Sequence, residues 1–297
     1  MLLTILSVTT CAVLIRIVAN PLSNVFQKQL TQRTAHPLYI ISATYGFLTL
    51  TCFGFWQQLQ VMNLSSTFWQ TILIVGFFAV IGNVFLVRAL EIGDLSVLGP
   101  INAYKSVVGL GIGLVLLNEI PGWWGLAGIL FIVVGSYVVL TTKQAKQGIS
   151  WRVFKRPEVR LRLAALLFSA IDGAFLKKAI ILSTPLTAFF FWCLLGFVFT
   201  LAWILLTIRS HWREQTQLLV SQKSTYAGLF LTVGITQVAS NIALAGMQVG
   251  YALALFQTSA LVSVLFGYQF FREQNIVRKL VGASIMVLGA ILITVFG

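Results

Sequence analysis

Three charged side chains stand out because they lie deep inside long apolar stretches of the sequence. Lys105 lies midway along one stretch beside Asn102 and Tyr104, Asp172 is the only carboxylate well inside one, and Arg16 lies in the first. A charge near the centre of a bilayer costs at least about 2.5–3.5 kcal/mol on insertion scales, so it usually faces a bundle interior or a cavity. These three residues are therefore candidates to line a substrate cavity.

Each candidate also has a structural interpretation. Lys105 either contacts substrate or belongs to a buried ion pair, and Asp172 either carries a coupling proton or neutralises Arg16 or Lys105. Arg16 is followed by Asn20 and Pro21, and its side chain alternatively reaches the interface by snorkelling. Pro21 indicates either an opened backbone near a transport site or a plain proline kink.

Uncharged polar side chains in the same stretches extend this candidate site. Amides inside a membrane often join helices to one another, at roughly 0.6 kcal/mol each, so the two interpretations stay open for them. The complete candidate set is Arg16, Asn24, Asn102, Tyr104, Lys105, Asp172, Asn241 and Gln257.

The elements that must position these residues are continuous apolar segments. The 297-residue chain is 58% hydrophobic and only 9% charged, with a mean hydropathy of +0.94. A spanning helix needs about 20 mostly apolar residues to cross about 30 Å of hydrocarbon. The composition predicts an all-α integral membrane protein with ten transmembrane helices, near residues 3–26, 38–57, 67–87, 95–117, 123–141, 161–182, 186–208, 225–246, 251–271 and 277–296.

The net charge of +13 does not indicate a nucleic-acid partner, because the basic residues occupy short connections between segments. Alternate connections differ sharply. One set holds sixteen basic residues and the other only Lys177 and Lys178. The positive-inside rule places the richer set in the cytoplasm and both termini outside. That set consists of Lys28, Arg33, Arg88, Lys143, Lys146, Arg152, Lys155, Arg156, Arg160, Arg162, Arg209, Arg213, Lys223, Arg272, Arg278 and Lys279.

The second half of the chain repeats features of the first. Three residues recur 154 positions later, Glu119, Gly128 and Gly135 as Glu273, Gly282 and Gly289, and Gly93 recurs as Gly250. Five spans per half is an odd number, so two copies must insert in opposite orientations, as in many transporters. We expect a first repeat at 1–148, a basic linker at 149–160 and a second repeat at 161–297.

Short motifs resemble a known family. They are Asn24-x-x-x-Lys28, then Ala89-Leu90-x-x-Gly93 before a Pro100-bearing span, then Asn118-Glu119, with Gln257 replacing the proline in the second half. The chain resembles the ten-helix EamA branch of the drug/metabolite transporter superfamily. The resemblance implies a cavity lined by the first, third, fourth, sixth, eighth and ninth helices, with the fifth and tenth packed outside. The resemblance also implies that both termini lie in the cytoplasm, whereas the charge distribution places them outside. We follow the charge distribution.

These observations predict a secondary active transporter of small organic metabolites, an exporter, which works by alternating access. Arg16 and Lys105 against Asp172 leave one excess positive charge, which favours an anionic or zwitterionic substrate; proton coupling is one option. The alternative is a lipid-headgroup flippase or another lipid-handling membrane protein. Both histidines fall at loop positions, so we expect no enzyme activity, metal or cofactor. The expected partners are a small-molecule substrate and the lipid bilayer, with no nucleic acid. The expected location is the cell membrane, as a multi-pass protein of the bacterial inner membrane; the sequence does not predict the oligomeric state.

Overall fold

The computed structural model describes residues 2–59, 61, 64–108, 122–140, 155–246, 252 and 255–296. Within these ranges the chain forms helices and no strand, so the prediction of an all-α membrane protein is confirmed. Each predicted span overlaps one helix of the set α1 (Leu2–Gln32), α2 (Pro37–Phe53), α3 (Ser66–Ile92), α4 (Leu95–Ile101), α6 (Trp123–Leu140), α7 (Pro157–Ile181), α8 (Pro185–Thr207), α10 (Lys223–Gly246), α12 (Ser259–Phe271) and α13 (Ile276–Phe296). Short helices η1 (Trp56–Gln58), η3 (Arg209–His211) and α9 (Trp212–Ser221) lie in connections.

Length and composition suit these helices to a membrane. Among the described residues, five helices are long and apolar enough to cross a bilayer, within α1, α3, α8, α10 and α13. Three shorter apolar helices are Pro37–Phe53, Trp123–Val139 and Leu255–Phe271. The protein therefore passes through the membrane several times.

Some sequence features fall outside the described residues or differ in position. Asn118, Glu119 and Gly250 lie outside the described ranges, as do Lys143, Lys146, Arg152 and the predicted repeat boundary at 148. Helix α7 begins at Pro157, about one turn before the predicted start at 161 and inside the predicted linker.

Matching local signals start the second helix of each half. In α2, Pro37 occupies the first turn and the His36 side chain accepts a hydrogen bond from the Leu38 amide at 3.3 Å. In α8, Pro185 occupies the first turn and Thr184 Oγ1 accepts from the Thr187 amide at 3.1 Å. Proline fits this position because the first amides of a helix have no partner within the helix.

Helix α1 continues through Pro21 as one helix. Proline has no amide hydrogen, so the regular hydrogen bond at this turn is missing. The helix nevertheless continues past Pro21. The interpretation that required an opened backbone at this position is therefore wrong.

The five most extensive helix pairs each join one half of the chain to the other. They are α1 with α10, α2 with α8, α3 with α7, α4 with α12, and α6 with α13. Exchanging the two halves replaces each spanning helix by the one at the same position in the other half, so that α1 exchanges with α7 and α3 with α10. Three pairs then map onto themselves, and the α1–α10 pair maps onto the α3–α7 pair. The packing is therefore unchanged by the exchange, as a two-fold relationship between repeats requires.

Glycines repeated in the two halves meet at the α6–α13 contact. A methyl group on Gly128 would lie 2.6 Å from the Gly289 carbonyl oxygen, and one on Gly135 would lie 2.6 Å from the Gly282 carbonyl oxygen. The earlier glycine of one helix thus meets the later glycine of the other, so the two equivalent helices run antiparallel. The predicted inverted orientation of the repeats is confirmed.

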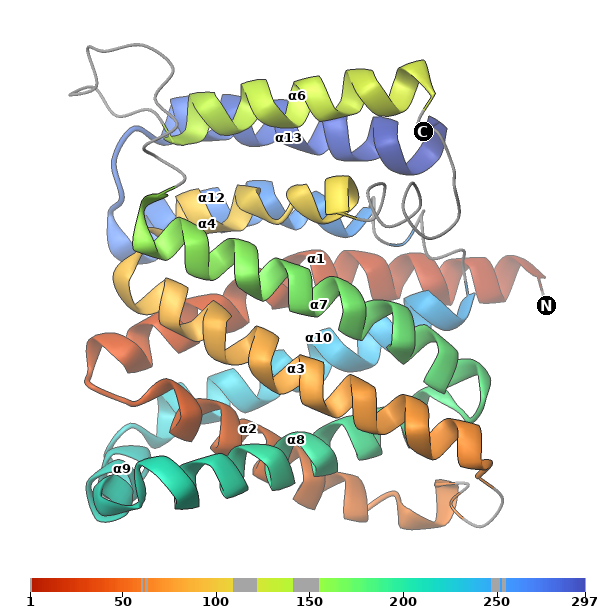
Figure 1. Cartoon of the computed structure of the whole chain (residues 1–297), viewed down its shortest axis with the longest axis vertical. Coiled ribbons are helices and arrows are strands. Elements are labelled where there is room, and N and C mark those ends of the chain that lie inside the picture. Colours follow the sequence, from red (N-terminus) through yellow and green to blue (C-terminus); the bar gives the residue numbers. More distant parts are fainter. Residues whose placement is uncertain are drawn as a thin grey trace.

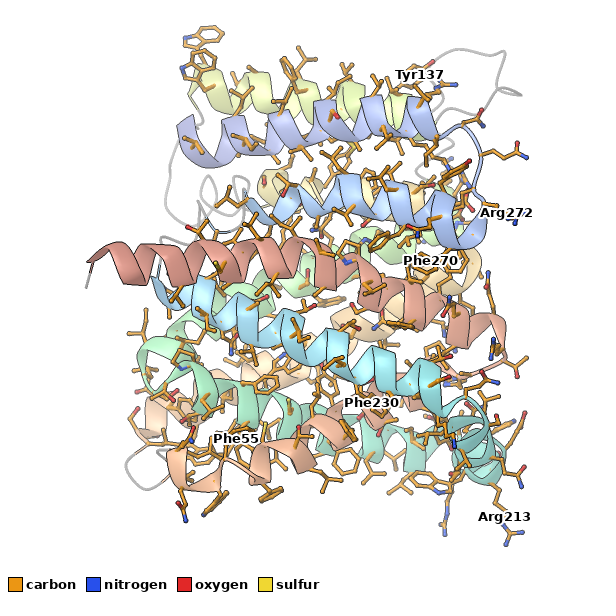
Figure 2. All side chains as sticks on the ribbon, turned by 180° about the vertical axis from the view of Figure 1, so that it is seen from behind. Phe55, Tyr137, Arg213, Phe230, Phe270 and Arg272 are labelled. Carbon is orange, nitrogen blue, oxygen red and sulfur yellow. The ribbon has the colours of Figure 1, made fainter. Side chains whose placement is uncertain are left out.

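The helix pairs stack along the long axis of the molecule (Figure 1). Helices α6 and α13 form one end and α2 and α8 the other, with α4 and α12 next to the first end and α1, α3, α7 and α10 in the middle. Helix α9 is seen end-on and so runs across the bundle. Figure 2 shows Arg213 and Arg272 on the same side of the bundle, at the right of the view, with Phe55 toward the opposite side.

Replacing Gly135 by alanine should destabilise the protein, because the added methyl group would meet the Gly282 carbonyl and the Met286 side chain below 3.0 Å. Overpacking of this kind costs about 1–3 kcal/mol. The measurement is the midpoint of thermal unfolding in detergent. Gly122→Ala is the matched control, since nothing lies within 4 Å of its added methyl. A Gly135→Ala midpoint equal to that of the control would contradict the close α6–α13 contact.

Candidate functional site

A cavity of about 210 Å³ lies at the seam between the two repeats. Its charged lining residues are Arg16 from α1, Lys105 just after α4, and Arg162 and Asp172 from α7. Asp172 is the one carboxylate among the described residues that line it. The pocket therefore carries three formal positive charges and one negative charge.

Arg16 is held in place from two sides. Its Nε donates a hydrogen bond to Ser240 Oγ of α10 at 2.8 Å, and its guanidinium carbon lies 3.6 Å above the centre of the Phe256 ring. Its Nη1 is buried and has no hydrogen-bond partner among the residues that the structure describes. Arg16 thus does not snorkel to the interface but presents a free donor beside the cavity.

A break in the fourth span positions Lys105. The amides of Asn102 and Ala103 donate to the carbonyls three residues earlier, at 3.0 and 2.9 Å, so the regular helical ladder stops after Pro100. Lys105 follows this break and lies close enough to Asp172, Arg16 and Arg162 to interact with them electrostatically. Discontinuous helices of this kind place polar groups at the centre of transporters.

Arg162 completes the break in α4. Because the Asn102 amide bonds to Gly99, the Leu98 carbonyl lacks its helical partner, and Arg162 Nε donates to it at 3.0 Å. Arg162 Nη2 also donates to Asn102 Oδ1 at 3.3 Å. The side chain is buried, with 8% exposure. Arg162 was not among the sequence candidates, since it was counted with the cytoplasmic loops although it lies one residue inside the predicted span at 161–182. Pro157, which begins α7 one turn earlier, is the signal that places Arg162 well inside the helix.

Asp172 forms no ion pair within the described part of the chain, and its Oδ1 is buried without a hydrogen-bond partner. The ion pair with Lys105 considered from the sequence is therefore not formed within hydrogen-bond distance. Gln27 and Trp192 also line this cavity, and Gln27 Oε1 and Trp192 Nε1 are buried without a hydrogen-bond partner among the described residues. Buried polar atoms are normally hydrogen-bonded, so these groups call for water or a ligand.

The other sequence candidates fall into three groups. Asn24 and Asn102 line the cavity. Gln257 and Asn241 are buried beside it, where Asn102 Nδ2 donates to Gln257 Oε1 at 3.2 Å and Asn241 Nδ2 donates to the Pro185 carbonyl at 3.0 Å. Tyr104 points elsewhere, toward α6, where its hydroxyl lies 2.7 Å from Ser136 Oγ.

More helices line the cavity than the resemblance implied. Ile41, Thr44 and Tyr45 come from α2, and Trp192 comes from α8. The second and seventh helices therefore add to the six expected ones. No charge marked these positions in the sequence, so intramembrane charge alone did not identify them.

A second polar cluster lies where α4 begins, on the side of the bundle that carries Lys28 and Lys279; this side is called the basic end. Asp94 precedes α4 without capping it through its side chain. Instead Glu273, from the other repeat, accepts the amides of Leu95 and Ser96 at 2.8 and 2.9 Å and a hydrogen bond from the Ser96 hydroxyl. Lys28 Nζ lies 3.1 Å from Glu273 Oε1. A carboxylate at a helix N-terminus satisfies free amides and suits the helix dipole.

Further bonds tie this cluster together and balance its charge. Lys28 Nζ also donates to the Gly93 carbonyl at 2.8 Å, and Lys279 Nζ lies 3.4 Å from Asp94 Oδ2. Lys28 is therefore more than a helix-end cation. In the second half, Lys177, its repeat counterpart, donates to the Leu244 carbonyl at the opposite end of the bundle.

Comparisons with known proteins agree with this architecture. A sequence model of the EamA-like transporter family matches residues 7–141 and 158–295, one match for each half. No curated protein matches the chain. One solved crystal structure of an unspecified protein shares the fold with a TM-score of 0.63 at 14% sequence identity, covering 95% of this chain and 96% of that chain.

Replacing Glu273 by glutamine should strongly destabilise the protein, because Lys28 and Lys279 would lose their buried counter-charge. Breaking a buried pair in this way costs about 3–5 kcal/mol. The measurement is the free energy of unfolding in detergent. Glu91→Gln is the control, since Glu91 pairs at 3.7 Å with half-exposed Arg88 and should contribute less than about 1 kcal/mol.

The difference in unfolding free energy between wild type and Glu273→Gln should depend on pH. Burial raises the pKa of Glu273, but hydrogen bonds from Ser96 and the charge of Lys28 outweigh burial and hold that pKa below its ordinary value of 4.5. The carboxylate therefore stabilises the fold fully above pH 4.5, and this contribution is lost as the pH falls through the lowered pKa. A stability difference between wild type and Glu273→Gln that grew toward acid pH would contradict this assignment.

Proposed function

Because the chain belongs to the EamA-like transporter family, we propose that it is a secondary active transporter of small organic metabolites. The observation that carries the proposal is the charged cavity at the seam of two inverted repeats. Transporters with inverted repeats bind substrate near the bilayer midplane and expose it first to one side and then to the other. The proposed location is the cell membrane, namely the bacterial inner membrane.

The charge of the cavity supports an anionic or zwitterionic substrate. Arg16, Lys105 and Arg162 outnumber Asp172 among the described lining residues. Asp172 Oδ1 is a free acceptor that suits an ammonium or hydroxyl donor of the substrate. Charge-assisted hydrogen bonds to such groups are stronger than neutral ones, and they orient the ligand.

We propose that proton exchange drives export. Asp172 lines the cavity and its Oδ1 has no hydrogen-bond partner among the described residues, so a proton and a hydroxyl or ammonium donor of the substrate compete for the same oxygen. In the proposed cycle, a proton entering the cavity from outside displaces substrate bound from the cytoplasm. Asp172→Asn should then retain exchange of substrate for substrate in proteoliposomes but lose accumulation driven by a proton gradient.

Transport itself is tested with four radiolabelled solutes, glycerol 3-phosphate, malate, glycerate and serine, in proteoliposomes with an imposed proton gradient. Lys105→Ala should lower the initial rate of the transported solute at least about tenfold, because hydrogen bonds to charged groups contribute roughly 1.5–3 kcal/mol. Lys178→Ala is the matched control, since Lys178 is exposed near the end of α7.

Other outcomes would overturn the proposal. Equal rates for Lys105→Ala and wild type would remove Lys105 from the site. No flux of any solute, together with protein-dependent movement of fluorescent lipid between leaflets, would replace transport of metabolites with the lipid-headgroup flippase.

A further inference from the structure

We infer that the cavity selects a small hydroxylated organic dianion, either a phosphate monoester or a hydroxy dicarboxylate, over monoanions and zwitterions. This inference narrows the substrate class of the proposed transporter and rests on the same cavity. The three charged residues recognised from the sequence, Arg16, Lys105 and Asp172, leave one excess positive charge. The buried position of Arg162 raises the formal excess to two.

The charge balance favours a ligand with two negative charges. Isolated charges in a low-dielectric interior are costly unless they are paired. A dianion would neutralise the excess of two, whereas a monoanion would leave one uncompensated cation and a zwitterion would leave both. The balanced Lys28–Glu273–Lys279–Asp94 cluster of the same protein shows the arrangement that forms when no ligand is needed.

The two arginines are fixed with donors to spare. Arg16 uses Nε for Ser240 and leaves Nη1 free. Arg162 uses Nε and Nη2 for Leu98 and Asn102, and its Nη1 makes no hydrogen bond to the described residues. Guanidinium groups recognise carboxylate and phosphate oxygens with defined geometry. Trp192 Nε1 adds an unpaired neutral donor to the same cavity.

Several of the other lining groups are acceptors, which favours hydroxyl groups on the ligand. The hydroxyls of Thr44, Ser169 and Thr236 each donate to a carbonyl of their own helix, at 2.7, 3.1 and 2.7 Å. A hydroxyl whose proton is used in this way can only accept. Gln27 Oε1 and Asp172 Oδ1 are also unpaired acceptors. A ligand that carries hydroxyl donors besides its anionic groups matches this lining.

The test is equilibrium binding to purified protein in phosphatidylcholine nanodiscs, measured by calorimetry. Glycerol 3-phosphate and malate are the dianionic probes, glycerate the hydroxylated monoanion and serine the hydroxylated zwitterion. At least one dianion should bind at least about tenfold more tightly than glycerate and serine. Arg162→Gln should weaken that dianion about tenfold or more and reduce its advantage over glycerate.

Two variants keep the test independent of folding. Arg162→Lys retains the charge and should restore most of the dianion preference even where the contact to Leu98 is lost. Arg160→Gln is the matched control, because Arg160 is exposed on the same helix and should leave all four affinities unchanged.

The outcomes separate this inference from the proposed function. Flux of serine or glycerate with no binding of either dianion would keep the transporter and overturn the dianion. Dianion binding without flux would keep the inference and overturn transport. Failure of all four probes to bind would overturn the inference. Loss of dianion binding in phosphatidylglycerol nanodiscs would assign the cavity to a lipid phosphate and would also overturn it.

Discussion

Uncompensated positive charge in the middle of a membrane protein is the constraint from which the account of the cavity follows. The fold brings Arg16, Lys105 and Arg162 to one cavity and supplies only Asp172 against them among the described lining residues. Charges removed from water require partners, so this cavity needs water or an anionic ligand to be stable. At the basic end of the bundle the protein does the opposite, pairing Lys28 and Lys279 with Glu273 and Asp94. The contrast distinguishes the proposed binding site from a structural ion cluster within one chain.

The two-fold arrangement explains why both features lie where repeats meet. Every major helix pair joins the two halves, so the cavity and the ion cluster each draw residues from both. Glu273 of the second repeat caps α4 of the first, and Arg162 of the second repeat satisfies the Leu98 carbonyl that the break in α4 leaves free. The break after Pro100 thus requires a hydrogen-bond donor, which the other half supplies as a cation. The same cation then changes the charge of the cavity.

Much of the architecture was predictable because membrane helices and repeated glycines leave direct marks in a sequence. The family model matches each half, and Gly128, Gly135, Gly282 and Gly289 meet as the repeat required. The site was less predictable. Intramembrane charge led to Arg16, Lys105 and Asp172, but Arg162 was counted with the loop charges because it lies only one residue inside the predicted start of its span at 161, whereas α7 begins at Pro157. Trp192 and Gln27 carry no local signal, since only the packing of distant helices leaves their polar atoms unpaired.

The most direct test of a wet, cationic cavity at the repeat seam is thiol accessibility at Ser169, which lines it. Ser169→Cys is made in a background where Cys11, Cys52 and Cys193 are replaced by serine, and Ala174→Cys on the exposed side of the same helix is the control. A membrane-impermeant maleimide is applied to oriented vesicles from each face in turn. The account predicts that the Ser169→Cys thiol is labelled from both faces, because alternating access opens the cavity to each, and that the Ala174→Cys thiol stays unlabelled in lipid. A Ser169→Cys thiol that is unreactive from both faces would contradict it.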